Sequence, residues 1–214
     1  MISSMKTVSL ILLAGGRGTR MGTPIPKVFL PLKGKPIALH SFETFKAIDA
    51  IDEIVVVCPE QFQPLFPEGT LFASPGKERQ DSMENGLAKT TGEIILTHDG
   101  ARPFVTQEEV LKLLEEGTAV GAAALGYPAK NTVKEVDQKG FVEKTLERSS
   151  LYEMATPQLL ARTVLEAGLN AANGKTFTDD VALAELVGHP VKVVMGSAQM
   201  KITTPTDLEL ASAL

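Results

Sequence analysis

The sequence contains very little cysteine: Cys58 is the only one among 214 residues. No intrachain disulfide can form, so a reducing compartment is the default and we expect a cytoplasmic protein. Long apolar runs are also missing, because no stretch approaches the roughly 18 apolar residues that a membrane helix needs. We therefore expect no membrane partner. Internal repeats and low-complexity segments are absent as well, which leaves an ordinary globular composition.

The chain has no surplus of basic residues either. It has 21 Lys and Arg against 26 Asp and Glu, which gives a formal net charge of −5. Proteins that bind nucleic-acid duplexes normally carry a basic face and a high isoelectric point, so we expect no nucleic-acid partner. A small anionic ligand remains compatible with this charge, because a few clustered cations are enough locally.

Apolar segments rich in Val, Ile and Leu alternate with amphipathic stretches along the whole chain. A helix is expected over residues 36–48, and Thr106 and Thr204 are each followed three residues later by an acidic residue that can complete a helix cap. This alternation predicts a single α/β domain over residues 1–214, with a mostly parallel sheet covered by helices on both faces. The expected strands are 8–13, 54–58, 94–97, 120–125 and 191–194.

One segment departs from this alternation. Residues 132–136 and 141–146 flank the turn sequence Asp137-Gln138-Lys139-Gly140, which predicts a β-hairpin. Such a hairpin is too small to bury its own apolar side chains. We therefore expect an arm over about residues 130–150 that projects from the domain and packs against a second subunit.

A glycine-rich loop directly follows the first expected strand, where Ala14-Gly15-Gly16-Arg17-Gly18-Thr19-Arg20 leads towards Lys27. Glycines at the carboxyl end of a strand let backbone N–H groups approach phosphate oxygens. Three nearby cations, Arg17, Arg20 and Lys27, suit a triphosphate. The plainer alternative is a glycine turn with solvated charges, and we prefer the phosphate site because of the cations and their position.

Other nucleotide and hydrolase motifs fail on spacing. Met21 stands where a dinucleotide fingerprint needs its last Gly or Ala, and no Gly-Lys-Ser/Thr closes the loop as in a P-loop. The sequence also has no Gly-x-Ser-x-Gly elbow and no Cys-x-x-Cys pair, which weakens hydrolase and zinc functions.

Two further segments carry polar groups to the expected strand ends. Asp99, at the end of the third strand, can hold Mg²⁺ or a ribose hydroxyl, or simply accept hydrogen bonds in a polar turn. Gly76, Arg79 and Ser82 precede a helix and can meet a base or phosphates, although a plain helix cap by Asp81 or Ser82 explains the same residues. His98 is expected to pack and bond locally at its strand end.

Together, and in this order, these motifs resemble the 2-C-methyl-D-erythritol 4-phosphate cytidylyltransferase family among the nucleotidyltransferases. The resemblance covers essentially the whole chain. Its motifs are Ala14-Gly15-Gly16-x-Gly18-x-Arg20-Met21 with Pro26-Lys27, Gly-x-x-Arg-x-x-Ser at 76–82, His98-Asp99-Gly100-Ala101-Arg102-Pro103, Thr156-Pro157-Gln158, Thr178-Asp179 and Lys201-Ile202-Thr203.

The resemblance implies a Rossmann-like three-layer sandwich with a projecting β-hairpin arm, and a homodimer. It also implies CTP and a polyol phosphate as substrates and Mg²⁺ as cofactor. Asp99, at the carboxyl end of its strand, is the residue that we expect at the metal. Arg20 and Lys27 would stabilise the transition state, while Lys201 and Arg148, the latter from the neighbouring subunit, would position the acceptor. The implied substrate-binding residues are Ala14, Gly15, Gly16, Arg17, Gly18, Gly76, Arg79, Ser82, Asp99, Gly100, Arg102, Thr156, Thr178 and Asp179.

Two alternatives remain at this point. A cytidylyltransferase for another polyol phosphate, such as ribitol 5-phosphate, would share the glycine-rich loop, and a nucleotide-binding regulatory protein without activity would share the fold. The presence of Arg20, Lys27 and Lys201 argues against the second. The chain also departs from the family pattern at Gln199-Met200, just before Lys201.

Overall fold

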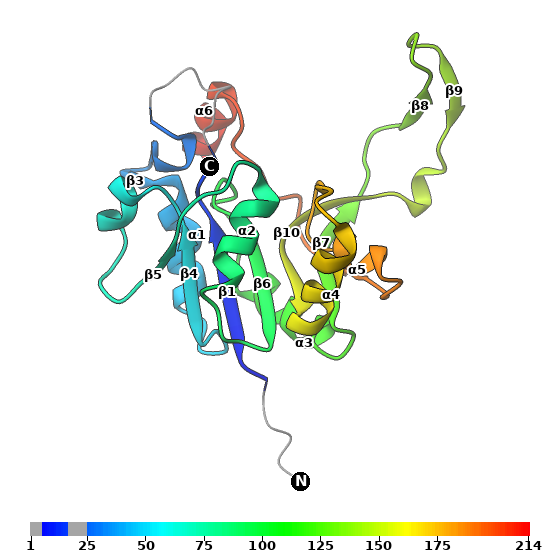
Figure 1. Cartoon of the computed structure of the whole chain (residues 1–214). Helices are drawn as coiled ribbons and strands as arrows, with labels where there is room; N and C mark the ends of the chain where they lie inside the picture. The colour runs from blue at the N-terminus through cyan, green and yellow to red at the C-terminus, as the bar shows by residue number, and fades with distance from the viewer. Residues whose placement is uncertain (1–5, 17–24) are drawn as a thin grey trace.

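A computed structural model describes residues 6–16 and 25–214, and its centre is a seven-stranded sheet in the order β11-β7-β10-β6-β1-β4-β5 (Figure 1). All neighbouring pairs are parallel except those of β10, which runs antiparallel to both β6 and β7. The mostly parallel sheet is therefore confirmed. The strands are β1 (Val8–Leu13), β4 (Glu53–Val57), β5 (Leu71–Ala73), β6 (Ile94–Asp99), β7 (Ala122–Pro128), β10 (Tyr152–Ala161) and β11 (Lys192–Met195).

Helices cover both faces of this sheet, as the sequence predicts. One face packs against α2 (Arg79–Leu87), α4 (Arg162–Ala172) and α5 (Ala182–Leu186), and the other against α1 (Ile37–Lys46) and α3 (Gln107–Gly117). Strand β1 serves both faces because successive side chains alternate: Ile11 and Leu13 join the first core, while Leu10 faces the second. The result is a three-layer α/β sandwich with the carboxyl ends of its parallel strands at one edge.

The expected strands agree with the structure to within a few residues. Residues 8–13 are β1 as predicted, and the strand expected at 94–97 runs on to Asp99. The strand expected at 120–125 begins only at Ala122, because a turn at Gly121 with a φ of 87° precedes it. Strands β5 and β10 are not among the expected strands.

The predicted helix caps are present. The Oγ1 of Thr106 accepts a hydrogen bond from the Glu109 backbone N–H at 3.2 Å, and the Oγ1 of Thr204 accepts one from the Asp207 N–H at 3.3 Å. Helix α6 (Pro205–Ala213) thus begins at the expected position, with proline in its first turn. It packs against Leu32 and Ile37 from the region of the short hairpin β2 (Pro31–Leu32) and β3 (Lys35–Pro36).

The arm is a separate two-stranded sheet of β8 (Lys134–Val136) and β9 (Val142–Thr145), which confirms the predicted hairpin. It stands clear of the rest of the chain (Figure 1). Its apolar side chains lie in solvent, with Phe141 69% exposed and Val142 59% exposed.

The expectation that Cys58 is a buried hydrophobic residue also agrees with the structure. Cys58 is completely buried after β4, and burial raises the pKa of its thiol to about 11, so it is an inert core residue. No helix in the described part of the chain is long and apolar enough to cross a membrane.

Candidate active site

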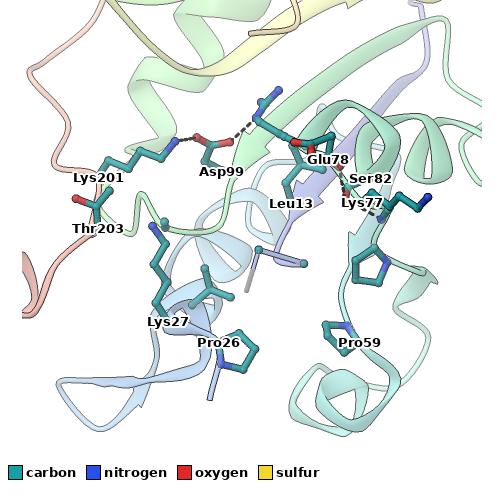
Figure 2. A pocket seen from close by; sticks show the side chains of 17 residues that line it. Leu13, Pro26, Lys27, Pro59, Lys77, Glu78, Ser82, Asp99, Lys201 and Thr203 are labelled. Atoms are coloured by element: carbon teal, nitrogen blue, oxygen red, sulfur yellow. Dashed lines mark hydrogen bonds and ion pairs between the residues drawn. The ribbon is translucent and has the colours of Figure 1, made fainter. Parts of the chain in front are cut away.

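A cavity of about 590 Å³ opens at the carboxyl ends of β1 and β6, and we call it the main cavity. Figure 2 shows Lys27 and Lys201 on one side of it and Lys77, Glu78 and Ser82 on the other. The structure thus gathers residues from both ends and the middle of the chain. The predicted site residues that line it are Gly15, Gly16, Lys27, Gly76, Arg79, Ser82, Asp99 and Lys201.

Glycine is required where the two loops of the cavity approach each other. A Cβ atom on Gly15 would lie 2.6 Å from the Cβ of Pro75, and one on Gly76 would lie 2.1 Å from the Cβ of Asp81. A side chain on Gly15 would push the two loops apart, and one on Gly76 would displace the first turn of α2. Ala14 is buried behind the glycines. Arg17, Gly18 and Arg20, which complete the predicted phosphate loop, lie outside the described residues.

The loop before α2 is held by its own side chains. The Oδ2 of Asp81 accepts hydrogen bonds from the backbone N–H groups of Lys77 and Glu78, both at 3.0 Å. The hydroxyl of Ser82 accepts from the Gly76 N–H at 3.0 Å and donates to the Glu78 carbonyl at 3.1 Å. The plain cap by Asp81 and Ser82 is therefore present, and it gives the cavity a fixed wall.

Asp99 lies between two cations at the end of β6. Its Oδ1 accepts from the Nε of Arg79 at 3.0 Å, and its Oδ2 accepts from the Nζ of Lys201 at 2.6 Å (Figure 2). Burial alone would raise the pKa of the Asp99 carboxyl, but Arg79 and Lys201 outweigh it and hold this pKa well below its usual range. Asp99 is therefore a carboxylate at any physiological pH.

Sequence reasoning missed Asp180. Its carboxylate is bound by both terminal nitrogens of Arg79, Nη1 to Oδ1 at 2.7 Å and Nη2 to Oδ2 at 2.8 Å, and its side chain is only 3% exposed. The available signal is the run Thr178-Asp179-Asp180, of which the family motif includes only the first two residues. Thr178 is exposed, and Asp179 accepts a hydrogen bond from the Ala182 N–H at 3.2 Å, so neither lines the main cavity.

His98 and Thr156 join β6 to β10 below the cavity. His98 is fully buried, and burial lowers the pKa of its imidazole to about 4, so the ring is neutral. Its Nε2 lies 3.0 Å from the Arg102 carbonyl, which can only accept, so Nε2 carries the proton. Nδ1 therefore accepts from the Thr156 hydroxyl at 3.1 Å, which in turn accepts from the Asp99 N–H at 3.1 Å. Thr156 holds the Asp99 backbone and does not line the main cavity.

This buried imidazole makes stability depend on pH. Its folded pKa of about 4 lies below its ordinary 6.5, so its contribution is fully present above pH 6.5 and is lost as the pH falls towards 4. The difference corresponds to about 3 kcal/mol of unfolding free energy. Urea unfolding from pH 7.5 to 4.5 should show this loss in the wild type and a flatter dependence in His98→Asn. Parallel curves for the two proteins would contradict this role of His98.

Lys201 lies on an irregular segment between β11 and α6, residues 196–204, which we call the strap. One end is tied to α3, because Glu109 accepts hydrogen bonds from the Ser197 N–H at 2.8 Å and from the Gln199 Nε2 at 3.1 Å. The other end is tied by the Ile202 N–H, which donates to the Ala101 carbonyl at 2.9 Å. Gln199, the departure from the family pattern, therefore secures the strap.

Two more predicted site residues, Gly100 and Arg102, do not line the main cavity but support the segments around it. Arg102 donates from Nη1 to the Gln199 carbonyl at 3.1 Å and so supports the strap. Gly100 sits where a Cβ would meet the Leu13 carbonyl oxygen at 3.1 Å, which lets β6 turn closely past β1.

Arg148 lies away from the main cavity of its own chain. It begins the short helix η4 (Arg148–Ser150) at the base of the arm, and its Nη1 donates to the Lys130 carbonyl at 2.9 Å. Together with Lys130, Tyr127 and Tyr152 it lines a second cavity of about 740 Å³. The structure of one chain therefore does not bring Arg148 to Lys27 and Lys201.

The described residues contain no cluster of three or more metal-binding side chains. Mg²⁺ is commonly held by only one or two carboxylates together with substrate phosphates, and Asp99 meets that smaller requirement. Because both of its oxygens accept from cations, an ion at Oδ2 would take the place of Lys201.

Comparison with known proteins agrees with this geometry. The family model of IspD, 2-C-methyl-D-erythritol 4-phosphate cytidylyltransferase, matches residues 8–214. A chloroplastic enzyme of that name from Oryza sativa subsp. japonica is 46% identical over 98% of this chain and 74% of its own length. One from Chlamydia pneumoniae is 42% identical over 96% of this chain and 98% of its own.

Solved structures of similar proteins share the fold. The 4-diphosphocytidyl-2C-methyl-D-erythritol synthase of Anaerococcus prevotii superimposes with a TM-score of 0.86 at 28% identity, over 98% of both chains. The 2-C-methyl-D-erythritol 4-phosphate cytidylyltransferase of Thermus thermophilus does so with a TM-score of 0.81 at 30% identity, over 97% of this chain and 98% of that one. The Rossmann-like fold is thereby confirmed.

Proposed function

Since the chain belongs to the 2-C-methyl-D-erythritol 4-phosphate cytidylyltransferase family and transfers CMP from CTP to that polyol phosphate, we propose that the main cavity is where the transfer takes place. The reaction gives 4-diphosphocytidyl-2-C-methyl-D-erythritol and releases pyrophosphate. The observation that carries the proposal is the convergence of Lys27, Lys201 and the glycine loop at one end of the sheet.

The main obstacle to this reaction is charge repulsion. The nucleophile is an oxygen of a phosphate monoester, whose second pKa is about 6, so it is already mostly ionised at pH 7 and needs no base. It must approach a triphosphate, and each pair of like charges at 4 Å costs on the order of 4 kcal/mol at an effective dielectric constant of 20. The residues of the site therefore have to supply positive charge and fixed positions.

The cavity supplies both. Lys27 and Lys201 approach from one side, and Gly15 and Gly16 of the glycine loop line the same cavity. Lys27 is proposed to meet the charge that develops between the α-phosphate and the leaving pyrophosphate, with Arg20 acting alike. The Lys201 side chain is proposed to leave Asp99 and to neutralise the phosphate of the incoming acceptor. Gly76, Arg79 and Ser82 form the wall against which the nucleotide rests.

A pyrophosphate-release assay with CTP and a panel of polyol phosphates tests the function. Rapid release is expected with 2-C-methyl-D-erythritol 4-phosphate and much slower release with ribitol 5-phosphate. Faster release with ribitol 5-phosphate would show that this other polyol phosphate is the acceptor. CTP binding without release for any acceptor would instead support an inactive regulatory protein.

We also propose Mg²⁺ as cofactor, with Asp99 beside the ion. Bound Mg²⁺ would supply positive charge to the phosphate oxygens of CTP. CTP titrations are expected to give at least tenfold weaker binding in EDTA for the wild type, and the same weak binding with and without Mg²⁺ for Asp99→Asn. Glu116→Gln, which removes a partly exposed carboxylate paired with Lys192 away from the main cavity, should behave as the wild type. Equal affinities under all conditions would exclude a metal at Asp99.

A homodimer and a cytoplasmic location complete the proposal. The exposed apolar side chains of the arm support a dimer, because an isolated two-stranded hairpin is marginally stable in water. The dimer would carry Arg148 towards the main cavity of the other subunit. The location is supported by a chain whose single cysteine is buried in the core.

A further inference from the structure

We propose that Asp180 is a positioning residue for cytidylyl transfer, which acts through Arg79 to hold the carboxylate of Asp99 in the wall of the main cavity. The inference rests on the proposed function of this cavity. Asp180 does not line the cavity itself, so it would act on substrates only through its neighbours.

The geometry is a row of alternating charges. Asp180 binds Arg79 through two parallel hydrogen bonds of 2.7 and 2.8 Å, Arg79 binds Asp99 at 3.0 Å, and Asp99 binds Lys201 at 2.6 Å. The row links the segment before α5, the first turn of α2, the end of β6 and the strap. A change in the position of Asp180 would therefore move Arg79 and Asp99, and through them Lys201.

The guanidinium of Arg79 directs its hydrogen-bond donors at Asp99 and Asp180 within this row. A guanidinium recognises a phosphate best with two parallel N–H groups. Its terminal pair is directed at Asp180, and its Nε is directed at Asp99. Arg79 therefore offers no free pair to a nucleotide, and its function in the cavity is to fix Asp99. Asp180 sets the orientation in which it does so.

Besides Arg79, side chains from β6 and β10 hold Asp180 in place. Its Oδ2 accepts from the Thr97 hydroxyl at 2.5 Å, and its backbone N–H donates to the Gln158 Oε1 at 2.8 Å. The same amide oxygen accepts from the Val181 N–H at 3.1 Å. A carboxylate that is 3% exposed, paired bidentately and supported by β6 and β10 is a rigid reference point for Arg79.

Without the charge of Asp180, Arg79 keeps only Asp99 as an anionic partner. It would then turn its terminal nitrogens towards Asp99 or towards the phosphates, and compete with Lys201 for the same carboxylate. The two glycine loops are held by other contacts: the Ala14 N–H donates to the Val57 carbonyl at 2.9 Å, and the Gly76 N–H donates to the Ser82 hydroxyl at 3.0 Å. Because Asp99 also keeps its charge in this variant, CTP binding should change little while the chemical step slows.

The experiment measures kcat and KM for CTP in Asp180→Asn. We expect kcat at least tenfold below the wild type and KM for CTP within threefold of it. In an Arg79→Gln background the same substitution should lower kcat by less than threefold further, because the residue through which Asp180 acts is already lost. A kcat within threefold of the wild type would overturn the inference, as would a full tenfold loss in the Arg79→Gln background.

Two further variants separate positioning from stability. Glu53→Gln removes a carboxylate that accepts hydrogen bonds from Thr91 and Gly92 at the opposite edge of the sheet, so it should lower the Tm without changing kcat. Thr97→Val removes one hydrogen bond to Asp180, and this variant tests the same inference if Asp180→Asn fails to fold. It should lower kcat at least threefold, and an unchanged kcat would overturn the inference. Failure of the wild type to turn over would instead refute the proposed function.

Discussion

Replacing Lys27 by alanine is expected to lower kcat by 10²–10³-fold while CTP affinity changes far less. Removing one donor that meets charge in the transition state typically costs this much, about 2.7–4 kcal/mol. Steady-state turnover and equilibrium CTP binding, measured on the same preparation, separate the two effects.

The backbone under Lys27 is rigid, which is why its side chain can meet a developing charge. Pro26 precedes it, the Phe29 N–H donates to the Pro26 carbonyl at 2.9 Å, and Val28 and Phe29 are anchored in the core. Lys35 provides the matched control, because it is an exposed lysine on the adjacent hairpin, paired with Glu43. Lys35→Ala should retain wild-type kcat.

The outcome that contradicts this role is turnover of Lys27→Ala within threefold of the wild type. Arg20→Ala should resemble Lys27→Ala, and the double variant should be much less than additive, because both cations would serve one charge. Full additivity of the two losses would show that they act on separate steps.

Mixing the Lys27→Ala and Arg148→Ala proteins is expected to restore activity at a polyol phosphate concentration too low for either protein to turn over alone. Arg148→Ala alone should raise KM for the polyol phosphate and leave CTP binding nearly unchanged. If Arg148 acts on the other subunit, a mixed dimer of Lys27→Ala and Arg148→Ala chains contains one site with both residues intact. Random exchange of equal amounts makes half of the dimers mixed, so about a quarter of wild-type activity should return.

The reason for this expectation is the position of Arg148 in one chain. It lies at the base of an arm whose Phe141 and Val142 are exposed, and it does not line the main cavity that contains Lys27. Subunit exchange should be confirmed by two differently tagged chains purified in succession. If the mixed dimer is isolated and remains inactive, Arg148 acts within its own subunit or outside the site, and the shared site is excluded.

Much of the fold follows from local sequence signals. The buried strands β1 and β6 are rich in Leu and Ile, interrupted only by Ser9 and by the polar residues 97–99 at the end of β6, which is typical of strands covered on both faces. The caps at Thr106 and Thr204 are equally local, because each is completed by a side chain three residues away. The main cavity could be anticipated because its glycines and Lys27 lie close together directly after the first strand.

The unexpected features depend on long-range contacts. Strand β10 contains Pro157, which cannot donate to a sheet, and the register shift between Met154 and Gln158 accommodates it at the centre of the sheet. Asp180 pairs with Arg79, 101 positions earlier, and no pattern around either residue reveals the contact. Local periodicity carries no information about which distant segments meet.

The attachment of the arm has a consequence for how such chains diversify. Pro128, at the end of β7, is directly paired with Tyr152, at the start of β10, so residues 129–151 leave the sheet and return to it at one point. Neighbouring antiparallel strands of this kind can be joined equally well by a tight hairpin turn. The arm is therefore an interchangeable module: replacing residues 129–151 with the arm of a relative should leave the register of every core strand the same.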